Sequence, residues 1–145
     1  MNDSQKQTVQ WFPGHMAKTR RLIKESLPFV DLVTEIVDAR IPMSSSNPEL
    51  KEMIGAKPRI VLLNKCDVAD EKTTAKWVEY YKKNGMYALP VDCRSGKGLN
   101  AYLPLVREVL KDKIKRNTEK GMVGKPLRVM VVGIPNTGKS SFINK

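Results

Sequence analysis

Long apolar runs, paired cysteines and acidic charge are scarce in this sequence of 145 residues. No stretch comes near the roughly 20 consecutive apolar residues of a membrane-spanning helix, and the polar residues 1–10 are unlike a secretory signal. Cys66 and Cys93, the two cysteines, each fall inside a candidate motif rather than in a disulfide pattern. These absences argue against a membrane protein and a disulfide scaffold, and we expect a protein of the reducing cytoplasm.

Basic residues, by contrast, are abundant. The 26 Lys and Arg residues outnumber the 15 Asp and Glu residues, which gives a formal net charge of +11. Apolar content of 41% and charged content of 28% are ordinary for a globular protein, so the unusual feature is the sign of the charge. Such an excess favours a polyanionic partner, either nucleic acid or an anionic membrane surface. A basic protein without such a partner is the alternative.

The pattern of apolar residues predicts an α/β fold. Four short runs rich in β-branched residues predict buried strands of a parallel sheet, at 32–38, 59–64, 87–92 and 127–133. Helical patterns cover 15–30, 71–85 and 98–116, with a weaker one over 47–56. The basic stretch 111–128, which also holds Gly and Pro, is the best candidate for a linker. Strands that alternate with helices predict a doubly wound α/β domain.

The end of the chain carries a phosphate-binding pattern. Gly133, Gly138, Lys139 and Ser140 match G-x-x-x-x-G-K-[ST], between a predicted strand and the start of a helix. Backbone N–H groups of such a loop hold phosphates, Lys139 would reach the β- and γ-phosphates, and Ser140 would bind Mg²⁺. The other predicted nucleotide-binding residues of this loop are Ile134, Pro135, Asn136, Thr137 and Ser141. A chance Gly-rich turn is the alternative.

Residues 64–67, "NKCD", follow the second predicted strand, where α/β sheets present ligands. This Asn-Lys-x-Asp pattern resembles the guanine-specificity motif of GTPases. An ionised Asp67 can accept two hydrogen bonds from guanine, a donor pair that adenine lacks. The stem of Lys65 could pack on the base, and the Asn64 amide could brace neighbouring loops. In isolation, a plain strand-to-loop transition explains the residues equally well.

The third predicted strand ends in "DCRSGKG", residues 92–98. Asp92, Cys93 and Arg94 would occupy the positions of the GTPase Ser-Ala-Lys motif, whose middle backbone N–H meets guanine O6. Their side chains depart from that motif, but the contact is made by the backbone. A simple strand-to-helix turn is the alternative.

The order of the motifs is the informative feature. An ordinary GTPase has its phosphate loop first, whereas this chain has the base motif, the Ser-Ala-Lys-like loop and then the phosphate loop. A parallel sheet gathers its site from loops at one edge, so a circular permutation preserves the site. The usual GTPase order then predicts that the fourth strand pairs with the first, followed by the second and third, with 127–133 as an exposed apolar edge.

Together these motifs make the chain resemble the circularly permuted GTPases of the RbgA/YlqF type, which are bacterial ribosome biogenesis factors. The resemblance implies a three-layer, parallel-sheet P-loop GTPase domain that uses GTP, GDP and Mg²⁺. It also implies a role in late maturation of the large ribosomal subunit, with that subunit and its rRNA as partners. We expect a monomer with no membrane partner. The matching segments are "WFPGHMAK" (11–18), "VDARIPMSSSNP" (37–48), "NKCD", "DCRSGKGL" and "GIPNTGKSS".

Three further residues gain a role from the resemblance. His15, the single histidine, would orient the attacking water, and with Lys139 it makes up the predicted catalytic pair. Taken alone, His15 is a surface or capping residue. Asn136 would help to bind K⁺, although an Asn tolerated in a turn is an equal alternative. Arg40 of the "DARIP" segment could contact phosphate or RNA, but we favour a pair with a carboxylate that shapes the loop.

Parts of a complete GTPase are missing after Ser140. No Asp-x-x-Gly motif, switch segment or helical RNA-binding domain follows, so we expect residues 1–145 to be a partial GTPase domain, poorly active by itself. A non-catalytic RNA- or ribosome-binding module with a partial nucleotide pocket is the alternative function. An ATP-using P-loop enzyme is a third hypothesis, which the base motif opposes.

Overall fold

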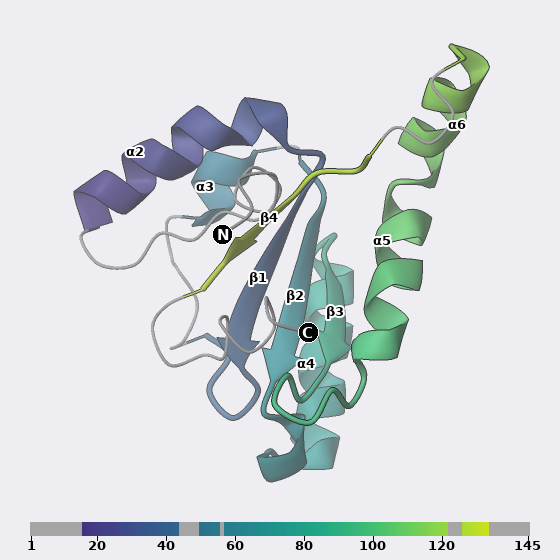
Figure 1. Ribbon diagram of the computed structural model, residues 1–145. Helices are drawn as coiled ribbons and strands as arrows, with labels where there is room; N and C mark the ends of the chain where they lie inside the picture. The colour runs from purple at the N-terminus through teal and green to yellow at the C-terminus, as the bar shows by residue number, and fades with distance from the viewer. Residues whose placement is uncertain (1–15, 44–49, 56, 122–125, 134–145) are drawn as a thin grey trace.

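The fold is built on one parallel sheet. The computed structural model describes residues 16–43, 50–55, 57–121 and 126–133. In this part of the chain the strands are β1 (Leu32–Asp38), β2 (Arg59–Asn64), β3 (Tyr87–Pro90) and β4 (Val129–Val132). They pair in the order β3-β2-β1-β4 (Figure 1). The predicted order, with the fourth strand beside the first, is therefore confirmed.

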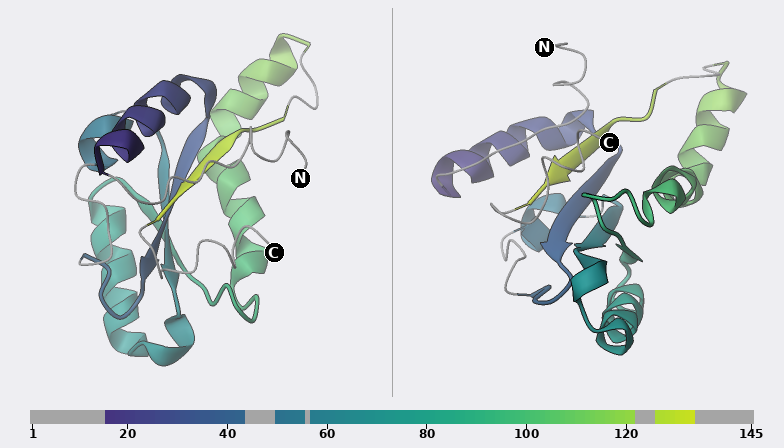
Figure 2. Two further views of the ribbon diagram at one scale, coloured as in Figure 1. Left: turned by 60° about the vertical axis from the view of Figure 1, so that its left-hand side comes forward. Right: turned by 60° about the horizontal axis from the view of Figure 1, so that its bottom comes forward.

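Helices cover both faces of the sheet, which makes three layers (Figures 1 and 2). Apolar side chains of α5 pack on one face, and those of α2, α3 and α4 pack on the other. In the described ranges, no helix has the length and apolar content to cross a membrane. The elements are α2 (Met16–Ser26), η1 (Leu27–Phe29), α3 (Leu50–Ile54), η2 (Cys66–Val68), α4 (Glu71–Lys83), η3 (Leu99–Ala101), α5 (Tyr102–Val109) and α6 (Lys111–Glu119).

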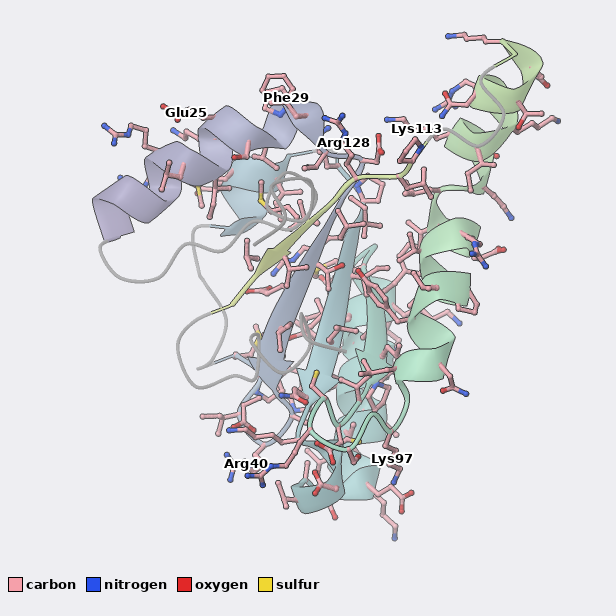
Figure 3. The ribbon with its side chains drawn as sticks, viewed as in Figure 1. Glu25, Phe29, Arg40, Lys97, Lys113 and Arg128 are labelled. Atoms are coloured by element: carbon pink, nitrogen blue, oxygen red, sulfur yellow. The ribbon has the colours of Figure 1, made fainter. Side chains whose placement is uncertain are left out.

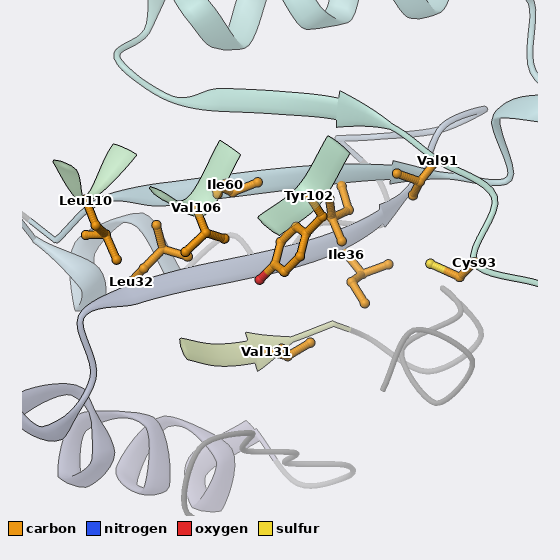
Figure 4. Packing of buried hydrophobic residues seen from close by; sticks show 10 residues of the cluster. Leu32, Ile36, Ile60, Val91, Cys93, Tyr102, Val106, Leu110 and Val131 are labelled. Atoms are coloured by element: carbon orange, nitrogen blue, oxygen red, sulfur yellow. The ribbon is translucent and has the colours of Figure 1, made fainter. Parts of the chain in front are cut away.

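Strand β1 is buried along its whole length, as predicted from its apolar run. Because side chains alternate along a strand, Leu32 and Ile36 pack toward α5, while Val33 and Val37 pack against the opposite helices. Figure 4 shows Tyr102 of α5 lying over the same face as Leu32 and Ile36. This two-sided core holds β1 at the centre of the domain.

Local signals explain the ends of α4. The Asp70 carboxylate accepts the Thr73 N–H at 2.9 Å and so caps the first turn. At the other end, Gly85 has φ +76° and donates its N–H to Lys82 O, while Met86 N–H donates to Tyr81 O. This pair of bonds is a Schellman motif, which a glycine favours because the left-handed conformation has no steric penalty there. The predicted helix end at Gly85 is confirmed.

The predicted linker was partly wrong. Residues 111–119 form α6, and the chain leaves the helical conformation at Gly121, where φ is +79°. Lys and Arg are good helix formers, so a run of positive charge does not by itself break a helix. The third and fourth strands are also shorter than predicted. As expected, β4 lies at an edge of the described sheet, but Met130, Val131 and Val132 are buried by the helices rather than exposed.

A buried hydrogen bond between Thr34 and Tyr102 joins α5 to β1, with 2.7 Å between the two hydroxyl oxygens. Replacing Tyr102 by Phe leaves the Thr34 hydroxyl without this partner in a buried position. We expect the free energy of unfolding to fall by about 1–2 kcal/mol, measured by urea denaturation. Tyr80→Phe, at a ring that is 41% exposed, is the control and should change it by less than about 0.5 kcal/mol. Equal effects of the two substitutions would contradict the role of this hydrogen bond.

Candidate functional site

The predicted base-reading loops meet at one edge of the sheet. All strand pairs are parallel, so the carboxyl ends of β1, β2 and β3 lie together, next to Gly133 at the end of β4. Open α/β sheets bind ligands at this edge. Arg40 and Lys97 mark it in Figure 3, at the opposite end of the sheet from Phe29 and Arg128.

Asn64 holds two of these loops together. It is buried, and its side-chain Oδ1 accepts the backbone N–H of Cys93 at 2.9 Å. Its backbone oxygen accepts the N–H of Ala39 at 2.7 Å, so the loop after β1 is attached to the same residue. The predicted bracing role of the Asn64 amide is confirmed.

Lys65 has an unusual backbone conformation. Its φ of 63° and ψ of 34° lie in the left-handed region, which residues other than glycine seldom adopt. Such strain persists when surrounding contacts impose it. Here the next residue, Cys66, donates its N–H to Val91 O at 3.0 Å, and the Lys65 ammonium lies 3.5 Å from Asp38 Oδ2. These contacts direct the Lys65 side chain along the carboxyl edge of the sheet.

Asp38 is the charged centre of the site. Its side chain is only 7% exposed and accepts two hydrogen bonds from the Arg40 side chain, Nε to Oδ1 at 2.9 Å and an Nη nitrogen to Oδ2 at 2.6 Å, and a third from the Arg40 backbone N–H. The hydrogen bond from the Arg40 side chain lowers the pKa of Asp38 to about 2, and Lys65 contributes in the same direction. The favoured interpretation of Arg40, a pair with a carboxylate that shapes the loop, is confirmed. The ion pair between Asp38 and Lys65 was not predicted from the sequence, because the two residues lie 27 positions apart at the ends of different strands.

Asp67 presents its side chain to solvent at the same edge. It lies in η2, two residues after the strained Lys65, and is exposed. The positive charge of Arg40 is close enough to interact with it. An exposed carboxylate beside fixed cations, on a loop held by Asn64, can accept hydrogen bonds from an incoming ligand. The contact of Asp67 with a base stays a prediction.

The loop after β3 is closed by Asp92. Its carboxylate accepts the Ser95 hydroxyl at 2.7 Å and the Arg94 N–H at 3.2 Å, and its backbone pairs with Lys97. Gly98 ends the loop with φ +83°, and a Cβ there would lie 2.6 Å from Pro90 O, so no other residue fits without a shift. The polar contacts and the glycine together give the loop a defined shape.

Cys93 carries the N–H that was predicted to meet guanine O6. That N–H donates to Asn64 Oδ1, so a base contact there would share or displace this bond. Both cysteines have free thiols, and burial raises the pKa of Cys66 and raises that of Cys93 to about 11. A protonated thiol is a poor nucleophile, so Cys93 acts as a small apolar side chain of the core.

The remaining predicted site residues lie outside the described ranges. These are His15 and Ile134, Pro135, Asn136, Thr137, Gly138, Lys139, Ser140 and Ser141. Of the phosphate loop the structure therefore describes only Gly133, at the carboxyl edge beside β1. Within the described ranges, no group of three His, Cys, Asp or Glu side chains could hold a metal ion.

Comparisons with known proteins give close relatives. Over 140 residues the chain is 54% identical to "Ribosome biogenesis GTPase A" of Priestia megaterium, which covers 95% of this chain and 48% of that protein. Over 137 residues it is 35% identical to "Mitochondrial ribosome-associated GTPase 1" of Bos taurus, covering 94% of this chain and 40% of that protein. No family model matches the chain.

The fold is also that of a solved relative. The crystal structure of GNP-bound YlqF from T. maritima matches with a TM-score of 0.60 and 37% identity, over 88% of this chain and 47% of that one. The chain thus spans about half the length of the curated relatives that it matches. The resemblance to the RbgA/YlqF type is confirmed for this segment.

The charge on Asp38 gives a pH-dependent prediction. Because the folded pKa is lowered from 3.8 to about 2, the stabilisation is present above pH 4 and is lost as the pH falls through 2. We expect Asp38→Asn to lower the free energy of unfolding by about 1–3 kcal/mol at pH 7, and the difference from the unsubstituted chain to shrink between pH 4 and 2. Urea denaturation across this range measures it. Glu79→Gln, on the exposed face of α4, should show no such trend, and a pH-independent effect of Asp38→Asn would refute the linkage.

Proposed function

We propose, from homology to a ribosome biogenesis GTPase that spans 95% of this chain and 48% of the relative, that the protein is a guanine-nucleotide-dependent ribosome assembly factor. In this proposal it binds GTP and GDP, hydrolyses GTP and acts in late maturation of the large ribosomal subunit by contacting its rRNA. The observation that carries the proposal is the arrangement of Asn64, Lys65 and Asp67 at the carboxyl edge of the sheet, beside the strand that leads into the phosphate pattern.

Guanine recognition is proposed for the base loop. The exposed carboxylate of Asp67 would accept hydrogen bonds from the N1–H and the exocyclic amino group of guanine. Lys65 would lie along the base, with its ammonium held by Asp38. The Asp92–Arg94 segment, attached to Asn64 through Cys93, would close the other side of the base. Adenine has no donor pair to match Asp67, so the same loop would exclude ATP.

We assign phosphate binding and hydrolysis to residues that lie, apart from Gly133, outside the described ranges. Lys139 would neutralise the β- and γ-phosphates, and the backbone N–H groups from Gly133 to Ser140 would hold their oxygens. Ser140 would hold Mg²⁺, which supplies positive charge to the phosphates, and Asn136 would help to hold K⁺. His15 would orient the water that attacks the γ-phosphate, so that GTP and water give GDP and phosphate.

The compartment is proposed from the same homology. The relatives carry both bacterial and mitochondrial names, and all of those quoted concern ribosomes. We propose the cytoplasm, where ribosomal subunits of a bacterial cell mature. Co-sedimentation of the protein with large ribosomal subunits, in a GTP analogue and in GDP, tests the role. Subunit binding that depends on the nucleotide supports the proposal, and its absence overturns the assembly role.

Specificity for guanine can be tested at Asp67. In Asp67→Asn, the side-chain amide would donate toward the exocyclic position, where xanthine offers a carbonyl instead of an amino group. We expect GDP affinity to fall at least about 10-fold and the affinity for xanthosine diphosphate to rise, measured by isothermal titration calorimetry. Asp70→Asn is the matched control, since Asn also caps α4 well and both affinities should be unchanged. Equal affinity for GDP and ADP in the unsubstituted chain would refute the base-reading role.

The role of His15 gives a separate prediction. His15→Ala should leave GDP affinity within about 2-fold, because the imidazole is not proposed to bind the nucleotide. Turnover of GTP in the presence of large ribosomal subunits should fall by about 10²- to 10⁴-fold, measured by phosphate release. His15→Gln, which retains a hydrogen-bonding side chain, should recover part of the rate. Unchanged turnover in His15→Ala would remove His15 from the mechanism.

A further inference from the structure

Three cations from distant parts of the chain converge at the amino edge of the sheet. Lys57 donates its ammonium to Val30 O at 2.7 Å, and the Lys113 ammonium pairs with the Asp31 carboxylate. Arg128 is attached at the same place, since its N–H donates to Asp31 Oδ2 at 2.8 Å and its oxygen accepts the Asp31 N–H at 2.8 Å. Its side chain is exposed. The Asp31 carboxylate binds both Lys113 and the Arg128 N–H, and Lys57 binds the backbone of the preceding residue.

Phe29 stands beside this cluster with an unusually exposed ring. It is 69% exposed, more than any other large apolar side chain in the described ranges, and it ends η1, just before Val30 and Asp31. Figure 3 shows Phe29, Arg128 and Lys113 at the same end of the molecule. Phe29 therefore presents an aromatic face to solvent beside exposed cations, which is the combination of groups that binds single-stranded nucleic acid.

Further basic residues extend the cluster on both sides. Arg21 and Lys24 are exposed on α2, which leads directly into η1, and Lys115 and Arg116 are exposed on α6. The acidic Glu25 also lies on this side, near Phe29 in Figure 3. A hollow of about 140 Å³ opens next to Lys57 on the same edge, bordered by Gly85 and Met86. The exposed side chains of this edge are therefore mainly positive, and Lys57 connects them to the hollow.

We propose that this surface, the Phe29 edge (Arg21, Lys24, Phe29, Lys57, Lys113 and Arg128), binds single-stranded RNA. Exposed Arg and Lys side chains would contact successive phosphates, and the Phe29 ring would stack on one unpaired base. Stacking accepts any base, so the surface recognises an unpaired strand rather than a sequence. An anionic membrane fits less well, because Phe29 is a single apolar anchor and membrane-binding faces usually present several.

The Phe29 edge lies at the opposite end of the strands from Asn64 and Asp67, so RNA and nucleotide would occupy separate sites. The inference rests on the proposed function only for the source of the RNA, the large ribosomal subunit. RNA binding is measured on the chain without nucleotide, and nucleotide binding is measured without RNA. Failure of one proposal is therefore distinguishable from failure of the other.

The test is fluorescence anisotropy of the protein with a labelled 12-nucleotide uridine RNA at several salt concentrations. We expect Phe29→Ala to weaken binding by about 5- to 100-fold with the salt dependence unchanged, since stacking is not ionic. Phe29→Tyr should retain most of the affinity. Arg128→Ala combined with Lys24→Ala should weaken binding and lower the slope of log affinity against log salt by about 1.4, which is about 0.7 for each lost phosphate contact on a single strand.

Matched controls come from other faces of the molecule. Leu103 on α5 is 59% exposed, and Lys76 on α4 is an exposed cation, so Leu103→Ala and Lys76→Ala should each change RNA affinity less than 2-fold. All variants should keep the GDP affinity of the unsubstituted chain. Equal effects of Phe29→Ala and Leu103→Ala would overturn the stacking role. Tighter binding to duplex RNA, or to vesicles of anionic phospholipid with no RNA binding, would overturn the proposal.

Discussion

The pairing of β4 with β1 is the contact on which the candidate site depends. It joins segments far apart in the chain, and Asp31 and Arg128, 97 residues apart, hydrogen-bond to each other just before the two strands begin. Through this pairing the strand that precedes the phosphate pattern lies beside the strand that ends in Asp38. The base loop is one strand further along the sheet. Without the β1–β4 pairing, the phosphate and base motifs would have no common edge.

The charged side chains at the carboxyl edge of the sheet differ from those at its amino edge. At the carboxyl edge, Asp38 is held by Arg40 and Lys65, whereas the exposed carboxylate of Asp67 is available to meet hydrogen-bond donors of a base. At the amino edge, Lys113 pairs with the Asp31 carboxylate, Lys57 binds the neighbouring Val30 O, and the Arg128 backbone is attached to Asp31. The two ends of the sheet therefore suit ligands of different chemistry.

Much of this architecture could be predicted from the sequence, because it follows from short apolar runs, single capping residues and the order of known motifs. Buried apolar runs predicted the strands, and the order of the GTPase motifs predicted the position of β4. The capping glycine at Gly85 predicted the end of α4. The predicted linker began too early, at residue 111, because charge was given more weight than helix propensity, although the helical pattern over 98–116 already covered most of α6. The Asp38–Lys65 pair could not be predicted, since it depends on how two loops approach in space and leaves no spacing pattern in the sequence.

The position of β4 has a consequence for the order in which the domain is made. During translation, β1, β2 and β3 emerge before β4, and their pairings involve segments separated by far fewer residues than those of β1 and β4. Contacts between near neighbours in sequence have a smaller loop-closure cost and form early. The base-reading loops can therefore take shape on the growing chain first, and the strand that carries the phosphate pattern is added to an existing sheet.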